Sequence, residues 1–263
     1  MHTLDMPPQQ PPQRNEIVEW YNSIPPITKA LFTLSIATTA ISTFGIISPS
    51  SLILYWPNIR NKLQLWRLVS CFFFNKISLG YAFNLYFLYR NSLQLENEVF
   101  QGQPADYMFF HLFTSGLQLA ASSLFGIYVL SDGLLLSIAY LWAQHHREMP
   151  VTFMFGIRFK ALYLPWAMIA SDFLMSGAIP RASVAGMVAS HIYYYLTSIY
   201  PSQGGRRYLQ TPEFLKRLFP ANSRAFRGGF GRQDQASGSS TSTNNNTNMF
   251  GRHTWGTGQR LGS

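Results

Sequence analysis

The sequence predicts an all-α polytopic membrane protein, and composition is the first reason. Hydrophobic residues make up 47% of the chain and charged residues only 12%, yet the mean hydropathy is close to neutral at +0.03. The apolar residues are therefore concentrated, between residues 29 and 200, and polar segments flank them. A soluble fold with so many long apolar runs would expose large apolar patches to water, so we disfavour it.

Apolar runs within residues 29–200 predict six membrane-crossing helices. A helix needs about 20 residues to cross the roughly 30 Å of hydrocarbon in a bilayer. The fourth run is shorter, and we expect neighbouring helices or a thinned membrane to accommodate it. The predicted spans are residues 31–47, 68–89, 107–130, 133–143, 159–177 and 182–199.

The basic residues predict that both termini are cytosolic. Six crossings place fifteen lysines and arginines on the cytosolic side and four on the opposite side, in agreement with the positive-inside rule. Residues 1–28 have no basic segment that leads into an apolar run, so they do not resemble a cleavable signal peptide. We expect them to form a cytosolic N-terminal segment before the membrane domain of residues 29–200.

The remaining residues predict a juxtamembrane segment, 201–220, and a disordered basic tail, 221–263. The run 237–246 consists of Ser, Gly, Thr, Asn and cannot build a core. Nine basic residues after Pro201 favour anionic lipids or acidic protein surfaces as partners, and a membrane anchor disfavours nucleic acid. Residues 211–219 suit either a helix in the headgroup plane or a short packed helix.

The sequence predicts no cofactor and no metal. Cys71 is the single cysteine, which excludes an intramolecular disulfide and every multi-thiolate metal site. We expect it to be a small buried residue.

Five segments of the chain together form a specific pattern. They are WYNSIPPIT (20–28), NLYFLY (84–89), GQPADY (102–107), WAQ (142–144) and FGIRFKALYLPW (155–166). These segments resemble the Derlin family, a catalytically inactive branch of the rhomboid-like proteins. The resemblance covers residues 16–219 and the last residues of the chain, and it implies a six-transmembrane-helix rhomboid-like fold.

The resemblance also implies a function. A Derlin is a non-catalytic factor of endoplasmic-reticulum-associated degradation, located in that membrane, which helps to export misfolded luminal or membrane proteins through a lateral gate and a locally thinned bilayer. The implied partners are a valosin-containing-protein type AAA ATPase and a membrane RING ubiquitin ligase. The working unit stays open between a monomer, a homo-oligomer and a half-channel completed by the ligase.

An active rhomboid protease is the first alternative function. Such an enzyme carries its serine in a Gly-x-Ser-Gly motif, which this chain lacks. Ser131, Ser137 and His191 fall in the fourth and sixth predicted spans, but catalysis needs a paired serine and histidine beside an oxyanion hole. We therefore predict no catalytic residues. A small-solute transporter is the second alternative, and the absence of a visible inverted repeat disfavours it.

Trp66 and Arg67 match a Trp-Arg pair that the resemblance places in the first luminal loop. The guanidinium can bind lipid phosphates while the indole lies at headgroup depth. An ordinary interfacial anchor is the alternative.

A ridge of small residues, Ala182, Gly186 and Ser190, recurs every four residues in the sixth predicted span. Such ridges let helix backbones approach closely. The resemblance expects Gly-xxx-Gly here, and tight packing without a transport role is the alternative.

Lys76 and Asp172 are charges inside the second and fifth predicted spans. Intramembrane charges usually face a partner or a wet cavity, so we predict a latch between them at the lateral gate. Snorkelling of each side chain to the interface is the alternative.

The end of the chain resembles the SHP box through which Derlins engage the AAA ATPase. An aromatic and a leucine can fill apolar pockets, and glycines let an extended strand approach closely. The residues are Trp255, Gly256, Gly258, Arg260, Leu261 and Gly262, and residues 226–232 are a looser echo.

Overall fold

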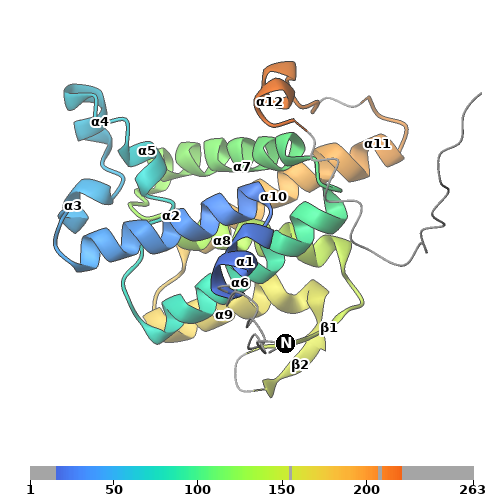
Figure 1. Cartoon of the computed structure of the whole chain (residues 1–263), viewed down its shortest axis with the longest axis horizontal. Coiled ribbons are helices and arrows are strands. Elements are labelled where there is room, and N and C mark those ends of the chain that lie inside the picture. Colours follow the sequence, from blue (N-terminus) through green and yellow to red (C-terminus); the bar gives the residue numbers. More distant parts are fainter. Residues whose placement is uncertain (1–15, 154–155, 207–208, 221–263) are drawn as a thin grey trace, which may run out of the picture. The chain divides into compact units, whose positions relative to one another are not determined.

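The computed structural model describes residues 16–153, 156–206 and 209–220. All of them belong to one compact unit, Met1–Gly228, while the second unit, Gly229–Ser263, lies outside the described residues. The described part is mostly helical, as the predicted all-α class requires (Figure 1). A two-stranded antiparallel hairpin, β1 with β2, is the addition that the sequence did not predict.

A helix lies at each of the six predicted spans, and these are α2, α6, α7, α8, α9 and α10. Short helices and the hairpin connect them. The bounds in chain order are α1 Glu16–Ser23, α2 Pro26–Thr43, α3 Pro49–Leu52, α4 Trp56–Lys62, α5 Arg67–Ser70, α6 Leu79–Gln94, η1 Leu95–Val99, α7 Pro104–Phe125, α8 Ser131–His145, β1 Pro150–Thr152, β2 Arg158–Lys160, η3 Ala161–Tyr163, α9 Leu164–Ser176, α10 Arg181–Tyr194, η4 Tyr195–Ile199, α11 Tyr200–Ser202 and α12 Glu213–Leu218.

The structure does not confirm the count of six spans. By length and composition, α7 is the one described helix that suffices to cross a membrane by itself. The helices α1 and α2 pass the same test together, but they meet at an angle of 118°. The other helices are shorter or more polar, although helical backbone continues from α6 into η1 and from α10 through η4 into α11.

Two predicted spans begin in the wrong place. The second was predicted from residue 68, but non-helical backbone separates α5 from α6, which starts at Leu79 with Ser78 accepting a hydrogen bond from the Tyr81 amide. The fifth was predicted from residue 159, which lies in β2, and α9 starts at Leu164. Hydropathy alone missed both breaks because an apolar strand or turn resembles an apolar helix in composition.

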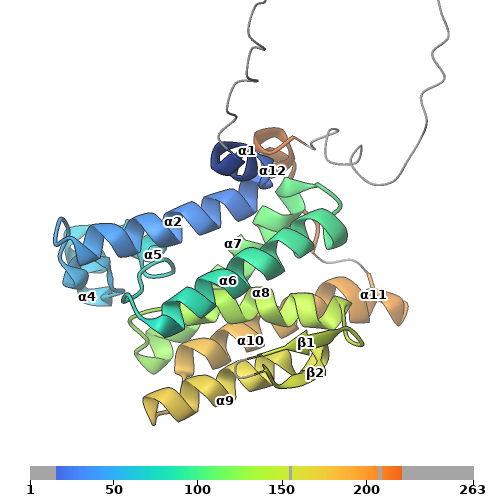
Figure 2. The ribbon, with the colours of Figure 1, turned by 60° about the horizontal axis from the view of Figure 1, so that its bottom comes forward.

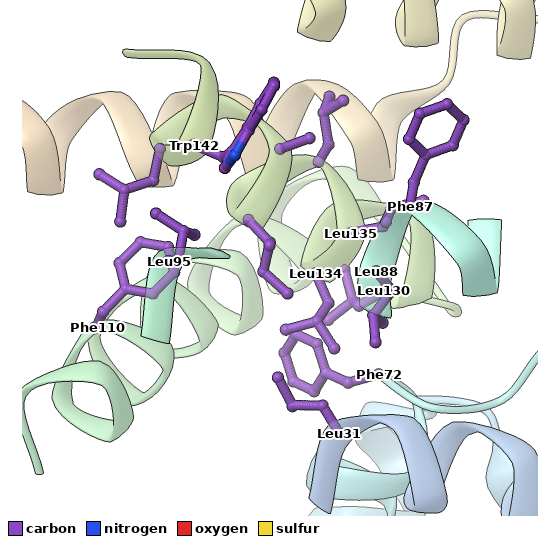
Figure 3. Packing of buried hydrophobic residues seen from close by; sticks show 14 of the residues in the cluster. Leu31, Phe72, Phe87, Leu88, Leu95, Phe110, Leu130, Leu134, Leu135 and Trp142 are labelled. Atoms are coloured by element: carbon purple, nitrogen blue, oxygen red, sulfur yellow. The ribbon is translucent and has the colours of Figure 1, made fainter. Parts of the chain in front are cut away.

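The helix α8 is the centre of the fold. Every residue from Leu134 to Ala143 is buried, and the helix packs against α6, α9 and α10 (Figure 2). Leu134, Leu135 and Trp142 point into a cluster with Phe87 and Leu88 of α6 and with Phe110 of α7 (Figure 3). A helix that is apolar on all sides is buried on all sides, so the short fourth segment is a core element of the bundle.

Backbones of α8 and α10 approach most closely at two glycines. A Cβ atom on Gly186 would lie 2.0 Å from the Gly133 carbonyl oxygen, which is far inside van der Waals contact. One turn further along, the Ser190 hydroxyl donates a hydrogen bond to the Ser137 carbonyl at 2.8 Å. The predicted small-residue ridge therefore lies against α8, where small side chains permit this approach.

Glu96 joins the first long helix to the rest of the bundle. Its carboxylate accepts hydrogen bonds from the Ile27 amide at 3.0 Å and from the amide and hydroxyl of Thr28 at 2.7 Å each. These amides belong to the first turn of α2, which has no partner for them within the helix. Ser92 extends the network to the Tyr107 hydroxyl on α7. Burial raises the pKa of Glu96, and the hydrogen bonds from Thr28 and Ile27 oppose that rise.

We expect Gly186→Ala to destabilise the protein by at least about 2 kcal/mol, because the new methyl group meets backbone that cannot move without separating α8 from α10. Thermal unfolding in detergent can be followed with a thiol-reactive dye, since Cys71 is fully buried and reacts only when the core opens. Gly116→Ala on α7 is the matched control. A Cβ there meets nothing within 4 Å, so this change should be neutral or stabilising by up to about 1 kcal/mol. Equal melting temperatures for the two variants would contradict the close packing of Gly186 against the α8 backbone.

We expect Glu96→Ala to lower stability by roughly 2–4 kcal/mol, because three buried donors lose their acceptor. Glu96→Gln keeps one carbonyl oxygen and should fall between this variant and the parent. Glu148→Ala is the control, since its ion pair with Lys160 is exposed and screened by water, and its loss should leave the melting temperature nearly unchanged. The same dye assay on Cys71 measures the melting temperatures of all three variants. An unchanged melting temperature for Glu96→Ala would refute the role of Glu96 as the hydrogen-bond acceptor for the first turn of α2.

Candidate functional site

A cavity of about 60 Å³ lies between α6 and α9, at the position predicted for the lateral gate. Its walls are mostly aromatic and methionine side chains, including Phe153 from the end of the hairpin. Three polar residues share the cavity with them: Asn84 of α6, and Ser171 and Asp172 of α9. The space between these two helices is therefore amphipathic, with polar groups in an otherwise apolar wall.

Asn84 also lines a second, smaller cavity between α2, α6 and α8. There its amide donates to the Asp132 carboxylate at 3.4 Å. The Ser131 hydroxyl donates to the Asn75 side chain at 3.1 Å, and both residues line the same cavity. The volume of about 10 Å³ matches a single water molecule. Because Asn84 lines both cavities, polar groups reach from the first turn of α8 to the α6–α9 cavity.

The structure does not bring Lys76 and Asp172 into an ion pair. Lys76 is exposed in the segment that precedes α6, so it lies outside the helix in which it was predicted. Asp172 is on α9 as predicted, and it accepts a hydrogen bond from the Ser183 hydroxyl at 2.8 Å. This bond ties α9 to the first turn of α10. The latch between the two charges stays a prediction.

Trp66 and Arg67 lie side by side but face different surroundings. Arg67 is buried, and its guanidinium donates to the Ser50 and Ile53 carbonyls at 2.6 and 2.8 Å and to the Gln64 side chain at 2.7 Å. The arginine therefore holds the loop between α2 and α6 together through its Nε and Nη1 atoms, which donate to protein acceptors. Trp66 is 56% exposed and can serve as the interfacial anchor.

The two serines considered for catalysis do not pair with the histidine. Ser137 donates to the Leu134 carbonyl at 2.7 Å within its own helix, and Ser131 donates to Asn75. The His191 ring bonds the Tyr140 hydroxyl at 2.6 Å. Nucleophilic catalysis needs a serine within hydrogen-bond reach of its base, and the described structure forms no such bond here.

The SHP-like box, Trp255 to Gly262, and the echo at residues 226–232 lie outside the described residues. The juxtamembrane segment contains α12. Leu215 is 3% exposed and the helix packs against α7, while Phe214 and Leu218 are 63% and 68% exposed. The structure thus has the short packed helix, which was one of the two forms considered for residues 211–219, and it also presents apolar side chains outward.

Asn84 and Asp132 are the polar residues of this region that the sequence analysis overlooked. Asn84 was noticed only as the first residue of a family-like segment, and Asp132 was not singled out. A polar side chain inside a long apolar run was the available signal, because such residues in membrane helices usually face the interior of the bundle. Glu96 gave no such signal, since it follows the predicted span.

Comparison with known proteins agrees with the resemblance. The family model described as the Der1-like family matches residues 24–213. The chain is 36% identical to human Derlin-1 over 253 residues, which cover 94% of this chain and 99% of that protein. It is 36% identical to Derlin-1 of Drosophila melanogaster, covering 81% and 87%, and 35% identical to Derlin-2.2 of Zea mays, covering 77% and 86%. Because the family model and these relatives span most of the chain, it belongs to the Der1-like family, the family of the Derlins.

Proposed function

We propose that the chain is a non-catalytic component of endoplasmic-reticulum-associated degradation that helps misfolded proteins to leave for the cytosol. Membership of the Der1-like family supports this role. The observation that carries the mechanism is the amphipathic cavity between α6 and α9. A polar chain that enters a membrane loses its hydration, and polar side chains along its path reduce that penalty. In this proposal a client enters between the two helices and contacts Asn84, Ser171 and Asp172.

Helix lengths support local thinning of the membrane. At 1.5 Å per residue, the 13 residues of α9, which exposes Phe173, Leu174 and Met175, extend about 20 Å, against roughly 30 Å for the hydrocarbon core. A bilayer that meets short helices thins around them. A thinner bilayer shortens the apolar barrier that a client has to cross.

The proposed partners follow from the tail and from the family. The SHP-like box would engage a valosin-containing-protein type AAA ATPase that pulls the client, and a membrane RING ubiquitin ligase would mark it. Both termini are cytosolic in this arrangement, which the distribution of basic residues supports.

We expect Asp172→Leu to slow the degradation of a misfolded luminal client several-fold, because it removes the charged group of the α6–α9 cavity and its bond to Ser183. Asp172→Asn keeps the bond-accepting oxygen and should retain more activity. Pulse-chase of the client in cells that carry each variant as the sole copy measures the effect. Asp106→Leu, in the first turn of α7 and away from the cavity, is the control. Normal client decay with Asp172→Leu would refute the proposed path.

We expect removal of residues 249–263 to abolish co-purification with the AAA ATPase in mild detergent, while co-purification with the ligase persists. Trp255→Ala with Leu261→Ala should reproduce the loss, because these two side chains would supply the apolar contacts. Phe226→Ala with Phe230→Ala in the echo is the matched control. Undiminished ATPase recovery without residues 249–263 would contradict the assignment of the SHP-like box.

A further inference from the structure

An apolar groove of about 490 Å³ lies between α7 and α10. None of its lining residues lines the α6–α9 cavity. Ten of its eleven lining residues are apolar, and the remaining one is Arg181. Several of the apolar residues are largely exposed, among them Phe125 at 63% and Val188 at 48%. The described part of the chain therefore leaves this groove uncovered. We call it the α7–α10 groove.

Arg181 gives the α7–α10 groove a polar end. It is the first residue of α10, and its guanidinium is exposed. One of its nitrogens reaches the Phe125 carbonyl at 3.4 Å, a long contact that leaves most of its five donors for other partners. The amino end of a helix carries partial positive charge, which adds to the charge of the side chain. A positive site at one end of an otherwise apolar groove is complementary to an amphipathic anion.

The length and the lining of the groove suit an acyl chain. From Val184 to Ile192 the groove follows α10 for about 12 Å at 1.5 Å per residue. A flexible acyl chain is apolar throughout and can follow the groove along this length, in contact with its apolar side chains.

We propose that the α7–α10 groove binds one phospholipid, with an acyl chain between the two helices and the phosphate at Arg181. The guanidinium suits this headgroup because its planar fork can donate two parallel hydrogen bonds to phosphate oxygens. The lipid then belongs to the leaflet in which Arg181 lies. It covers a surface whose lining residues are all different from those of the client path, and the proposal does not depend on the function of that path.

Photolabelling of the full chain in phosphatidylcholine nanodiscs tests the site. The probe is a phosphatidylcholine that carries a diazirine in one acyl chain, and mass spectrometry maps the labelled peptides. We expect labelling concentrated in residues 117–127 and 179–192. Arg181→Glu should reduce it about tenfold or more, as expected when a charge-assisted hydrogen bond is replaced by repulsion. Arg60→Glu, at an exposed arginine of α4, should leave it unchanged.

A second pair of variants tests the groove itself. Val188→Trp places an indole in the groove, whereas Leu112→Trp places one on the surface of α7 outside it, and both parent side chains are 48% exposed. Only Val188→Trp should suppress the labelling, and protection of Cys71 from a thiol-reactive dye verifies the fold of both variants. If Val188→Trp unfolds, Arg181→Glu decides alone.

Three results would overturn the proposal. Labelling spread evenly around the bundle would mean that lipid contacts this surface without a site. Equal labelling by a diazirine-bearing diacylglycerol that lacks the phosphate, insensitive to Arg181→Glu, would remove the headgroup contact. Disulfide formation between two copies of Val188→Cys would show that a second copy of this chain covers the groove, since Cys71 is buried.

Discussion

The close approach of α8 and α10 is the constraint on which the other contacts depend. Gly133 and Gly186 bring the two backbones together, and Ser190 fixes their register by its bond to the Ser137 carbonyl. Because α8 is also covered by α6 and α9, its position sets the spacing of the helices around it. The α6–α9 cavity on one side and the α7–α10 groove on the other both follow from where this buried helix lies.

Within the described bundle, several polar contacts join elements that are distant in the sequence. Glu96 accepts from the first turn of α2, Asn84 donates to Asp132 of α8, and Ser183 donates to Asp172 of α9. In hydrocarbon such groups have no water to bond, so each one needs a protein partner or a wet cavity. The same chemistry that holds the helices in place supplies the polar surface proposed for a client.

Individual residues show how far sequence reasoning reached. The ridge of Ala182, Gly186 and Ser190 was identified from its spacing of four, because helical periodicity is local. Arg67 was identified as important but was expected to bind lipid phosphate, and its actual acceptors at Ser50 and Ile53 come from a loop whose fold no local pattern specifies. Lys76 was placed in a helix because its neighbours are apolar, and the break before Leu79 was invisible to hydropathy.

The sequence by itself determined the helical class, the presence of a helix at each predicted span, though not where α6 and α9 begin, and membership of the Der1-like family. These properties depend on composition, on periodicity over one or two turns and on short strings of residues, all of which can be read locally. Tertiary structure alone decided that Glu96 caps α2, that Ser131 and Ser137 have partners other than His191, and that Lys76 lies outside α6. Those outcomes depend on which helices meet and at what depth, and residues such as Ile27 and Glu96, 69 positions apart, become neighbours only when the bundle closes around α8.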